Sequence, residues 1–421
     1  MKMKRRWKGL LLFVLLVVVL VGGRLIAGLL LQEAPRVLTP EEETLRAHAL
    51  ELHHDAVVFD GHNDVANRIL EFGFDLAMDG DELSDRSTFL YEGGPFTWLP
   101  NPPYGENVAT DTDLARIREG GLDAQFFSIW VDFSFYDPAV PEQSTQRALD
   151  MIEVLQEQVR RYPDDIENAY TAQDVKRIAS EGKLAALMGL EGGHAIADDL
   201  ENLRRFYELG IRYMTLTHNV SHNWADSSTG DSINNGLSEF GRDVVGEMNL
   251  LGMIVDVSHV SDETFWDVLE VTSAPVIASH SNSRALANHP RNMTDEMIRA
   301  MVANDGVVMI NFMNPFLDQR QTEYWKIMGW HWFWHPRDHE TSLSLVVDHI
   351  DHVVQVAGID HVGLGSDFDG MTFLPEDLKD VGDFPNITVE LVRRGYSDED
   401  VYKILGGNVL RVLAYAERVA S

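Results

Sequence analysis

The sequence predicts an α/β protein, a (β/α)8 TIM-like barrel preceded by an N-terminal transmembrane helix. Two observations predict it: eight short apolar runs alternate with helical patterns, and one long apolar segment follows a basic N-terminus. The chain has 421 residues, of which 45% are hydrophobic and 24% charged. A chain of this size and composition can bury one large core or two ordinary ones, and it is too apolar to be disordered.

Charge and cysteine content exclude several classes of function. Lys and Arg total 34 against 67 Asp and Glu, which gives a formal net charge of −33. No basic surplus is available to displace the counterions of a nucleic acid, so we expect no nucleic acid partner. Because the chain has no cysteine, disulfides, thiolate nucleophiles and thiolate zinc sites are excluded. Any metal must be held by histidine and carboxylate side chains.

The N-terminus predicts a membrane anchor. Residues 1–31 hold six cations and no acid, and residues 9–31 are apolar over a length that could cross a bilayer, for which about 20 helical residues suffice. A cleaved signal peptide is the alternative, but no small-x-small cleavage site directly follows the apolar run. We expect a single-pass signal anchor with the N-terminus in the cytoplasm and the main domain on the other side of the membrane.

A polar stalk with two prolines, residues 32–45, leads into a helix that should begin near Thr39 or Pro40. The eight apolar runs that we interpret as strands lie at 56–64, 122–131, 184–191, 211–218, 252–259, 275–280, 306–312 and 361–368. Eight is the number that closes a (β/α)8 barrel, whose chemistry lies where the strands end.

Two connections are unusually long. Residues 73–110 contain glycines, prolines and aromatic residues, and residues 313–340 contain Trp325, Trp330, Trp332 and Trp334. Long loops at a barrel mouth are often lids or binding walls, but these aromatic side chains could equally serve only to pack the loops down. Residues 341–357 and 376–420 are typical of helices that close the barrel.

Most of the predicted strands end in a side chain that can bind a metal or move a proton. These residues are His62, Asp64, Glu191, His218, His259, His280 and Asp367, which is followed by Asp369. Each alone is more often a hydrogen-bonded or capping residue. Together they indicate a metal site, because a packed interior tolerates several converging ionisable groups only with a partner. Imidazole and carboxylate groups are suitable zinc ligands. Because there are more candidate ligands than one catalytic zinc ion usually takes, two ions that share a carboxylate are the better interpretation.

These residues resemble the membrane dipeptidases, also called renal dipeptidases, of metallopeptidase family M19. The matching segments include DGHNDV (60–65), GLEGGHAI (189–196), DVSHV (256–260), IASHSNSRALANHPRN (277–292) and VGLGSDFDG (362–370). The resemblance covers essentially all of residues 46–421, which we expect to form the metallo-dipeptidase barrel.

The resemblance implies a role for each residue of a site with two zinc ions. His62 and Asp64 would bind the first ion, His259 and His280 the second, and Glu191 both; His218 would polarise the substrate, Arg291 would hold its carboxylate, and Asp367 would handle the proton. Water between two zinc ions is acidic enough to attack the amide of a dipeptide or a similar small substrate. His194 and His222 lie beside the motifs, and we expect them to be structural or to support the site.

The chain also departs from animal members of the family. The C-terminus lacks a hydrophobic tail, so no GPI anchor is expected. Whether the protein forms a homodimer is left undecided, but without cysteine no disulfide would link the two chains. Sequons at Asn219, Asn292 and Asn386 are interpreted as chance or host-dependent matches, because a glycan on Asn219, beside His218, would obstruct the pocket.

Two other functions stay open at this point. One is a related two-metal hydrolase that acts on a β-lactam or an N-acyl amino acid, and the other is a binding or adhesion protein that keeps the barrel without turnover. The sequence leaves the preferred side chains, the stereochemistry and the physiological metal undetermined.

Overall fold

A computed structural model describes residues 38–80, 110–136, 140–328, 341–371 and 373–419. The chain divides into two compact units, Met1–Arg46 and Ala47–Ser421. The predicted transmembrane helix and most of the stalk lie outside the described residues, which begin just before helix α2 (Pro40–Asp55). In the described ranges, no helix has both the length and the apolar character needed to cross a bilayer.

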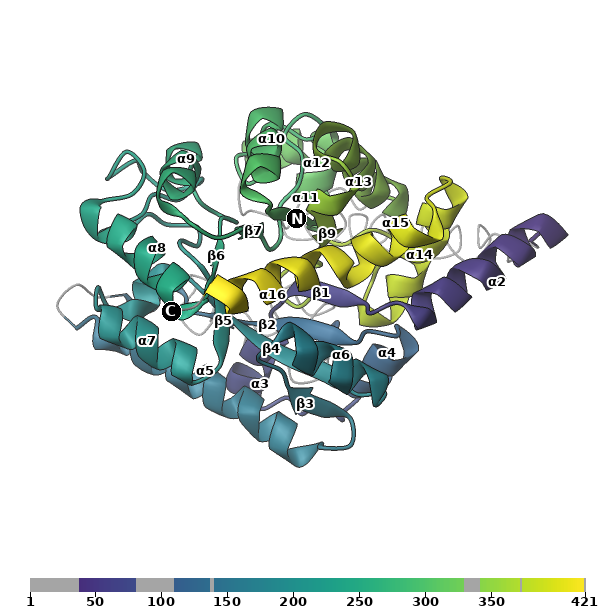
Figure 1. The fold of residues 1–421 in the computed structure, drawn as a ribbon, viewed down its shortest axis with the longest axis horizontal. Coiled ribbons are helices and arrows are strands. Elements are labelled where there is room, and N and C mark those ends of the chain that lie inside the picture. Colours follow the sequence, from purple (N-terminus) through teal and green to yellow (C-terminus); the bar gives the residue numbers. More distant parts are fainter. Residues whose placement is uncertain (1–37, 81–109, 137–139, 329–340, 372, 420–421) are drawn as a thin grey trace, which may run out of the picture. The chain divides into compact units, whose positions relative to one another are not determined.

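Eight parallel strands of the second unit close into a barrel (Figure 1). They are β1 (Phe59–Asn63), β2 (Ala124–Trp130), β4 (Leu184–Glu191), β5 (Ile211–Thr215), β6 (Ile254–Asp256), β7 (Ile277–Ala278), β8 (Val307–Ile310) and β9 (Val362–Leu364). The order of hydrogen-bonded neighbours is β2-β1-β9-β8-β7-β6-β5-β4, and the pairing of β2 with β4 closes the ring. Each predicted apolar run contains one of these strands, so the predicted barrel is confirmed.

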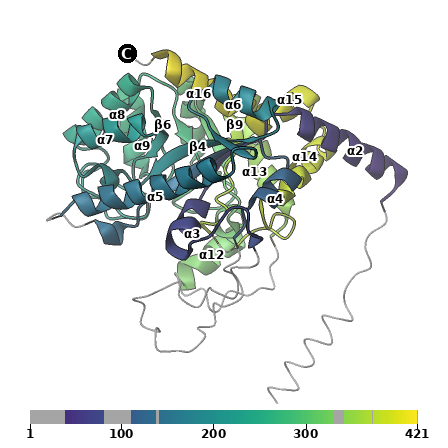
Figure 2. The same ribbon diagram turned by 90° about the horizontal axis from the view of Figure 1, so that it is seen from below.

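The end of the barrel where the strands begin is filled with apolar side chains. First residues of several strands, among them Phe59, Ile254 and Val307, form one buried cluster with Val409 and Leu413. The last two belong to α16 (Asn408–Val419), which lies beside α6 (Ala172–Ser180) at this end (Figure 2). Because this end is closed by packing, the polar chemistry is left to the end where the strands finish.

The other helices of the second unit bury apolar side chains. They are α3 (Val65–Phe72), α4 (Leu114–Glu119), α5 (Glu142–Arg161), α7 (Leu200–Glu208), α8 (Glu239–Leu251), α9 (Asp262–Val271), α10 (Asp295–Asn304), α13 (Leu343–Ala357), α14 (Phe384–Arg393) and α15 (Asp398–Tyr402). Of these, α3, α5, α7, α8, α10 and α13 pack against strands of the barrel. Several begin at a hydroxyl residue that caps them, as Ser261 does by accepting the backbone N–H of Thr264. Helix α13 and the helices α14 to α16 confirm the helical character predicted for 341–357 and for much of 376–420.

Two features differ from the prediction. A short strand, β3 (Ile166–Asn168), pairs with the beginning of β4 outside the ring, and its three residues carry too little apolar pattern to be recognised. Part of the connection expected to be a long loop is helical, because Pro315 starts α11 (Asn314–Leu317) and the Asp318 carboxylate accepts the backbone N–H of Arg320 at the start of α12 (Gln319–Met328). Trp325 lies in α12, whereas Trp330, Trp332, Trp334 and residues 81–109 lie outside the described residues.

Candidate metal centre

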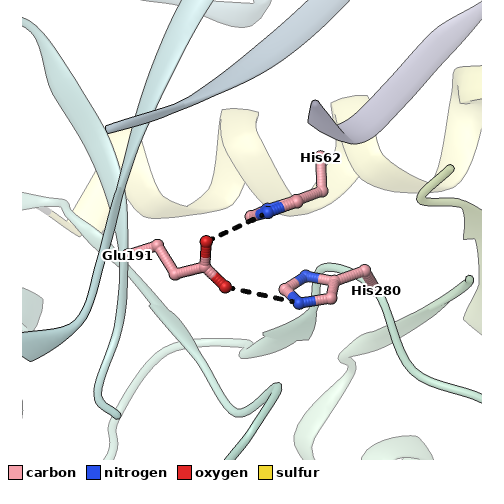
Figure 3. A group of neighbouring side chains, drawn as sticks. All are labelled: His62, Glu191 and His280. Carbon is pink, nitrogen blue, oxygen red and sulfur yellow. Dashed lines mark ion pairs between the residues drawn. The ribbon is translucent and has the colours of Figure 1, made fainter. Parts of the chain in front are cut away.

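The five predicted ligand side chains meet at the carboxyl end of the barrel. His62 lies in β1 and Glu191 ends β4, while Asp64, His259 and His280 follow β1, β6 and β7 within three residues. Figure 3 shows the side chains of His62, Glu191 and His280 pointing toward one another from these separate strands. Strand ends that are distant along the chain therefore place their polar side chains in one small volume, as a parallel barrel requires.

Glu191 lies at the centre of this group. Its Oε2 is 3.2 Å from His62 Nε2, and its Oε1 is 3.2 Å from His259 Nε2 and 3.5 Å from His280 Nε2. Asp64 Oδ2 is 3.3 Å from the same Nε2 atom of His62. The two oxygens of Glu191 thus face different imidazoles, an arrangement in which one carboxylate can serve two cations.

In His62, His259 and His280, the ring nitrogen that points away from Glu191 is Nδ1, and each Nδ1 has an oxygen partner. His259 Nδ1 is 3.2 Å from the amide oxygen of Asn219, which can only accept, so Nδ1 carries the hydrogen. His62 Nδ1 is 2.9 Å from the hydroxyl of Tyr213, whose own hydrogen is directed to the Gly61 carbonyl oxygen at 3.3 Å. Both rings therefore direct the lone pair of Nε2 toward Glu191, as metal-binding histidines do.

His280 is oriented by a carboxylate through a hydroxyl. Ser279 Oγ donates to Asp256 Oδ2 at 2.6 Å, which leaves its oxygen to accept from His280 Nδ1 at 2.7 Å. Like the other two rings, His280 then directs an Nε2 lone pair inward.

The inward nitrogens fit a metal and fit one another badly. His259 Nε2 and His280 Nε2 are 2.9 Å apart, so two lone pairs face each other. His62 Nε2 is buried and makes no hydrogen bond among the described residues, although carboxylate oxygens of Asp64 and Glu191 lie 3.3 and 3.2 Å from it. Three groups have donor atoms within 4.8 Å of one another: His62, Glu191 and His280; Glu191, His218 and His259; and His62, Asp64 and Asp367. Cations would satisfy all these atoms.

The pKa shifts of these side chains also indicate that the group favours a bound positive charge. Burial opposes a charge on His62, but the oxygen atoms around its ring raise its pKa well above the usual value. Burial would raise the pKa of Glu191, and the neighbouring imidazoles instead hold it well below its usual range. Burial lowers the pKa of His259 and His280 well below normal, so both rings are neutral, which is the form that binds a metal.

Asp367 and His218 complete the group. Asp367 follows β9, accepts a hydrogen bond from Asn311 Nδ2 at 2.8 Å, and has its pKa raised to about 8 by burial. His218 follows β5 and is half-buried; burial lowers its pKa, and Trp130 Nε1 donates to its Nδ1 at 3.3 Å. Near neutral pH and without a metal, the Asp367 carboxyl group therefore holds a proton and the His218 ring is uncharged.

Arg291 is a buried cation beside this group. Its side chain reaches the carbonyl oxygen of His280 at 3.1 Å and Ser281 Oγ at 3.4 Å, and its guanidinium carbon lies 5.4 Å from the centre of the Phe316 ring. The residue is 4% exposed, and no acidic side chain forms an ion pair with it within the described part of the chain. Burial lowers its pKa to about 10, so it stays charged at neutral pH and can accept an anion.

Several contributing residues were not recognised from the sequence. Ser128 Oγ donates to Glu191 Oε2 at 3.0 Å, and Trp130 and Tyr213 hold two of the imidazoles. The alternation in FFSIW, which places Ser128 and Trp130 on one face of a strand, was the available signal.

Three residues beside the motifs lie outside the group. His222 Nε2 bonds to the Leu216 carbonyl oxygen at 2.8 Å, and its ring centre is 6.0 Å from that of His194. Asp369 turns away to accept the backbone N–H of Asp111 at 3.0 Å. His194 and His222 are buried and belong to none of the candidate metal groups of the described residues.

Known proteins resemble this chain over most of its length. A family model described as "Membrane dipeptidase (Peptidase family M19)" matches residues 46–421. "Dipeptidase tcpJ" of Claviceps purpurea is 40% identical over 321 residues, which are 75% of this chain and 72% of that protein. An uncharacterized dipeptidase of Schizosaccharomyces pombe is 33% identical over 393 residues, 91% of this chain and 86% of that protein.

Solved structures show the same fold. The probable dipeptidase PvdM from Pseudomonas aeruginosa matches with a TM-score of 0.75 and 26% identity, over 91% of this chain and 100% of that one. A metallo peptidase from Rhodobacter sphaeroides, liganded with a phosphinate mimic of the dipeptide L-Ala-D-Ala, matches with a TM-score of 0.67 and 28% identity, over 86% and 99%.

Proposed function

This chain belongs to the membrane dipeptidase family, peptidase family M19, and is a peptide-bond hydrolase; we propose that it is a zinc dipeptidase that uses two metal ions per chain. One observation carries the proposal. The two oxygens of Glu191 face His62 on one side and the facing nitrogens of His259 and His280 on the other.

We assign His62 and Asp64 to one ion, His259 and His280 to the other, and Glu191 to both. A mixture of imidazole and carboxylate donors suits zinc. Bound zinc ions acidify water and polarise a carbonyl group, which supplies a nucleophile near neutral pH.

Arg291 would hold the terminal carboxylate of the substrate. A planar guanidinium can pair with a carboxylate through two parallel hydrogen bonds, and this one is buried without an acidic partner in the described structure. A fixed anchor close to the reacting bond limits the substrate to a very short peptide, which is the expected behaviour of a dipeptidase.

His218 and Asp367 would act on the reacting amide. A neutral His218 can donate a hydrogen bond to the carbonyl oxygen as negative charge develops on it. Asp367, whose pKa is raised to about 8, can hold a proton and pass it to the departing nitrogen.

Metal removal tests the proposal. We expect full-length protein treated with a chelator to stop releasing amino acids from L-Ala-D-Ala, a probe chosen from the phosphinate in the related structure, and to recover with close to two zinc ions per chain. His280→Ala should lose zinc and nearly all activity. His352→Ala is the matched control, because that ring lies on α13 and its hydrogen bond is to Asp295 on α10, away from the metal centre. Full activity in a metal-free preparation would contradict the proposal.

Arg291→Ala separates a dipeptidase from a hydrolase of other small amides. We expect KM for the dipeptide to rise about 10- to 100-fold, because a charged hydrogen-bonded pair is lost. The C-terminal amide of the same dipeptide has no carboxylate, so the variant and the parent should cleave it at the same low rate. An equal loss on both substrates would refute the role of Arg291 as a carboxylate anchor.

We also propose that residues 9–31 anchor the protein in the membrane, with the catalytic domain on the non-cytoplasmic side. The support is the run of apolar residues behind a cluster of cations. Protease added to intact cells should digest the main domain, and complete protection would refute this orientation.

A further inference from the structure

We infer that Trp130 is a positioning residue for His218, whose tautomer it fixes so that Nε2 carries the hydrogen and can donate to the substrate. This inference rests on the proposed function, because it concerns the residue assigned there to the carbonyl oxygen. It adds Trp130, to which the resemblance assigned no role.

The contact between the two rings defines the tautomer. Trp130 Nε1 lies 3.3 Å from His218 Nδ1, and the rings meet edge to face with an angle of 74° and centres 5.6 Å apart. An indole N–H can only donate, so Nδ1 must accept and cannot carry a hydrogen. A neutral imidazole has one ring hydrogen, which must then be on Nε2.

The strand that carries Trp130 fixes the position of this donor. Trp130 ends β2 and pairs in register with Glu191 of β4, and the backbone N–H of Val131 donates to the Glu191 carbonyl oxygen at 3.1 Å. Ser128, two residues earlier on the same face, donates to the Glu191 carboxylate. One strand end therefore supplies two donors, one for the central carboxylate and one for His218.

His218 is also held from its backbone side. Ser227 Oγ donates to the carbonyl oxygen of His218 at 2.6 Å and lies 3.3 Å from that of His259. With the main chain fixed there and Nδ1 fixed by Trp130, the ring has little freedom to turn.

The four imidazoles of the site differ in the hydrogen-bond partner of Nδ1. For His62, His259 and His280 the partner is an oxygen that accepts, so the inner nitrogen has a lone pair and can bind a metal. For His218 the partner is a donor, so the other nitrogen has a hydrogen. The same residue type is thereby divided into three ligands and one hydrogen-bond donor.

A double-mutant cycle on the full-length protein tests the inference. We expect Trp130→Phe to lower kcat for L-Ala-D-Ala about two- to tenfold, the usual effect of one hydrogen bond, with KM and zinc content near the parent values. His218→Ala should lower kcat by about 10²–10³. In the His218→Ala background, Trp130→Phe should have no further effect. Trp266→Phe, an exposed tryptophan of α9, is the matched control and should change nothing.

The outcomes separate the two proposals. An unchanged kcat in Trp130→Phe, or the same loss with and without His218, would overturn the role of Trp130. An unchanged kcat in His218→Ala would instead overturn the role of His218 in the proposed function.

A second measurement does not depend on turnover. In ¹⁵N NMR spectra of protein labelled at histidine, the signals absent from His218→Ala should report an Nδ1 without hydrogen. Trp130→Phe should shift them toward a mixture of tautomers. Signals that do not move would overturn the inference.

Discussion

Replacing Asp256 by asparagine should weaken zinc binding at His280, although the two side chains are joined only through a serine. Asp256 Oδ1 accepts the backbone N–H groups of Ser258 at 3.0 Å and Ser279 at 2.8 Å. Its Oδ2 accepts the hydroxyls of Thr215 at 2.5 Å and Ser279 at 2.6 Å. Four donors therefore point at this one carboxylate.

An asparagine side chain has only one oxygen for these four donors. The backbone N–H groups cannot reverse, so the oxygen stays with them and the NH₂ group faces the two hydroxyls. Ser279 Oγ must then accept from the amide and turn its hydrogen toward His280 Nδ1. His280 would carry its own hydrogen on Nε2, and the lone pair directed at Glu191 would be lost.

The expected magnitudes follow from these contacts. Disturbing the partner of a metal ligand typically weakens metal affinity about 10- to 100-fold. Two hydroxyl–carboxylate bonds, worth about 1.5–3 kcal/mol each, become neutral bonds worth about 0.5–1.5 kcal/mol each. The free energy of unfolding of metal-free protein should therefore fall by about 2–3 kcal/mol. Zinc affinity is measured by competition with a chromogenic chelator, and stability by urea unfolding.

Asp60→Asn provides the matched control. Asp60 is also fully buried and accepts the N–H and the hydroxyl of Ser366, at 2.7 and 2.6 Å, but in the described structure that hydroxyl bonds to no imidazole. It should lose stability and keep the zinc affinity of the parent. If Asp256→Asn bound two zinc ions as tightly as the parent protein, the tautomer reasoning for His280 would be wrong.

Three further changes probe other parts of the barrel. Tyr213→Phe removes the hydroxyl 2.9 Å from His62 Nδ1 and should weaken zinc binding about 10-fold or more by chelator competition. Gly189→Ala would place a Cβ 2.0 Å from Cζ of the Tyr213 ring and should cost about 3 kcal/mol or more in urea unfolding, whereas Gly246→Ala on α8, with no atom within 4 Å, should be neutral or stabilising. Burial raises the pKa of Asp123 from 3.8 to about 6, so the folded state holds this proton more tightly and stability should fall, by at most about 3 kcal/mol, as pH rises from about 4 to 6. Asp123→Asn should lack that fall, and an identical pH dependence would contradict the assignment.

The barrel could be predicted because each of its strands is buried on both faces. A strand in that position forms a continuous apolar run, and the runs stand out from the amphipathic helices between them. β3 lies outside the ring with only Ile166 buried, so it has no such run. The helices α11 and α12 were missed because their turn residues and aromatic side chains hid the helical pattern.

The candidate ligands could be predicted for a similar reason. A side chain that directly ends a recognisable strand must lie at the mouth of the barrel, so the sequence alone places His62, Glu191 and His280 near one another. Their partners could not be predicted this way. Tyr213 reaches His62 across the barrel, and Ser128 reaches Glu191 from a neighbouring strand, so both contacts depend on register and barrel closure. Arg291 lies in no strand, and only the family resemblance indicated it.

The site concentrates three carboxylates among buried residues. Asp64 and Asp367 lie close to His62, Glu191 lies close to the same ring, and the opposite end of the barrel is filled with apolar side chains. Burial raises the pKa of Asp367, and the carboxylates of Asp64 and Glu191 add to that effect. Burial opposes a charge on His62, but the same two carboxylates help to raise its pKa. A divalent cation supplies the same positive charge while it uses the nitrogen lone pair that a proton would occupy. The raised pKa of His62 and the facing nitrogens of His259 and His280 are therefore both consistent with the proposed cations.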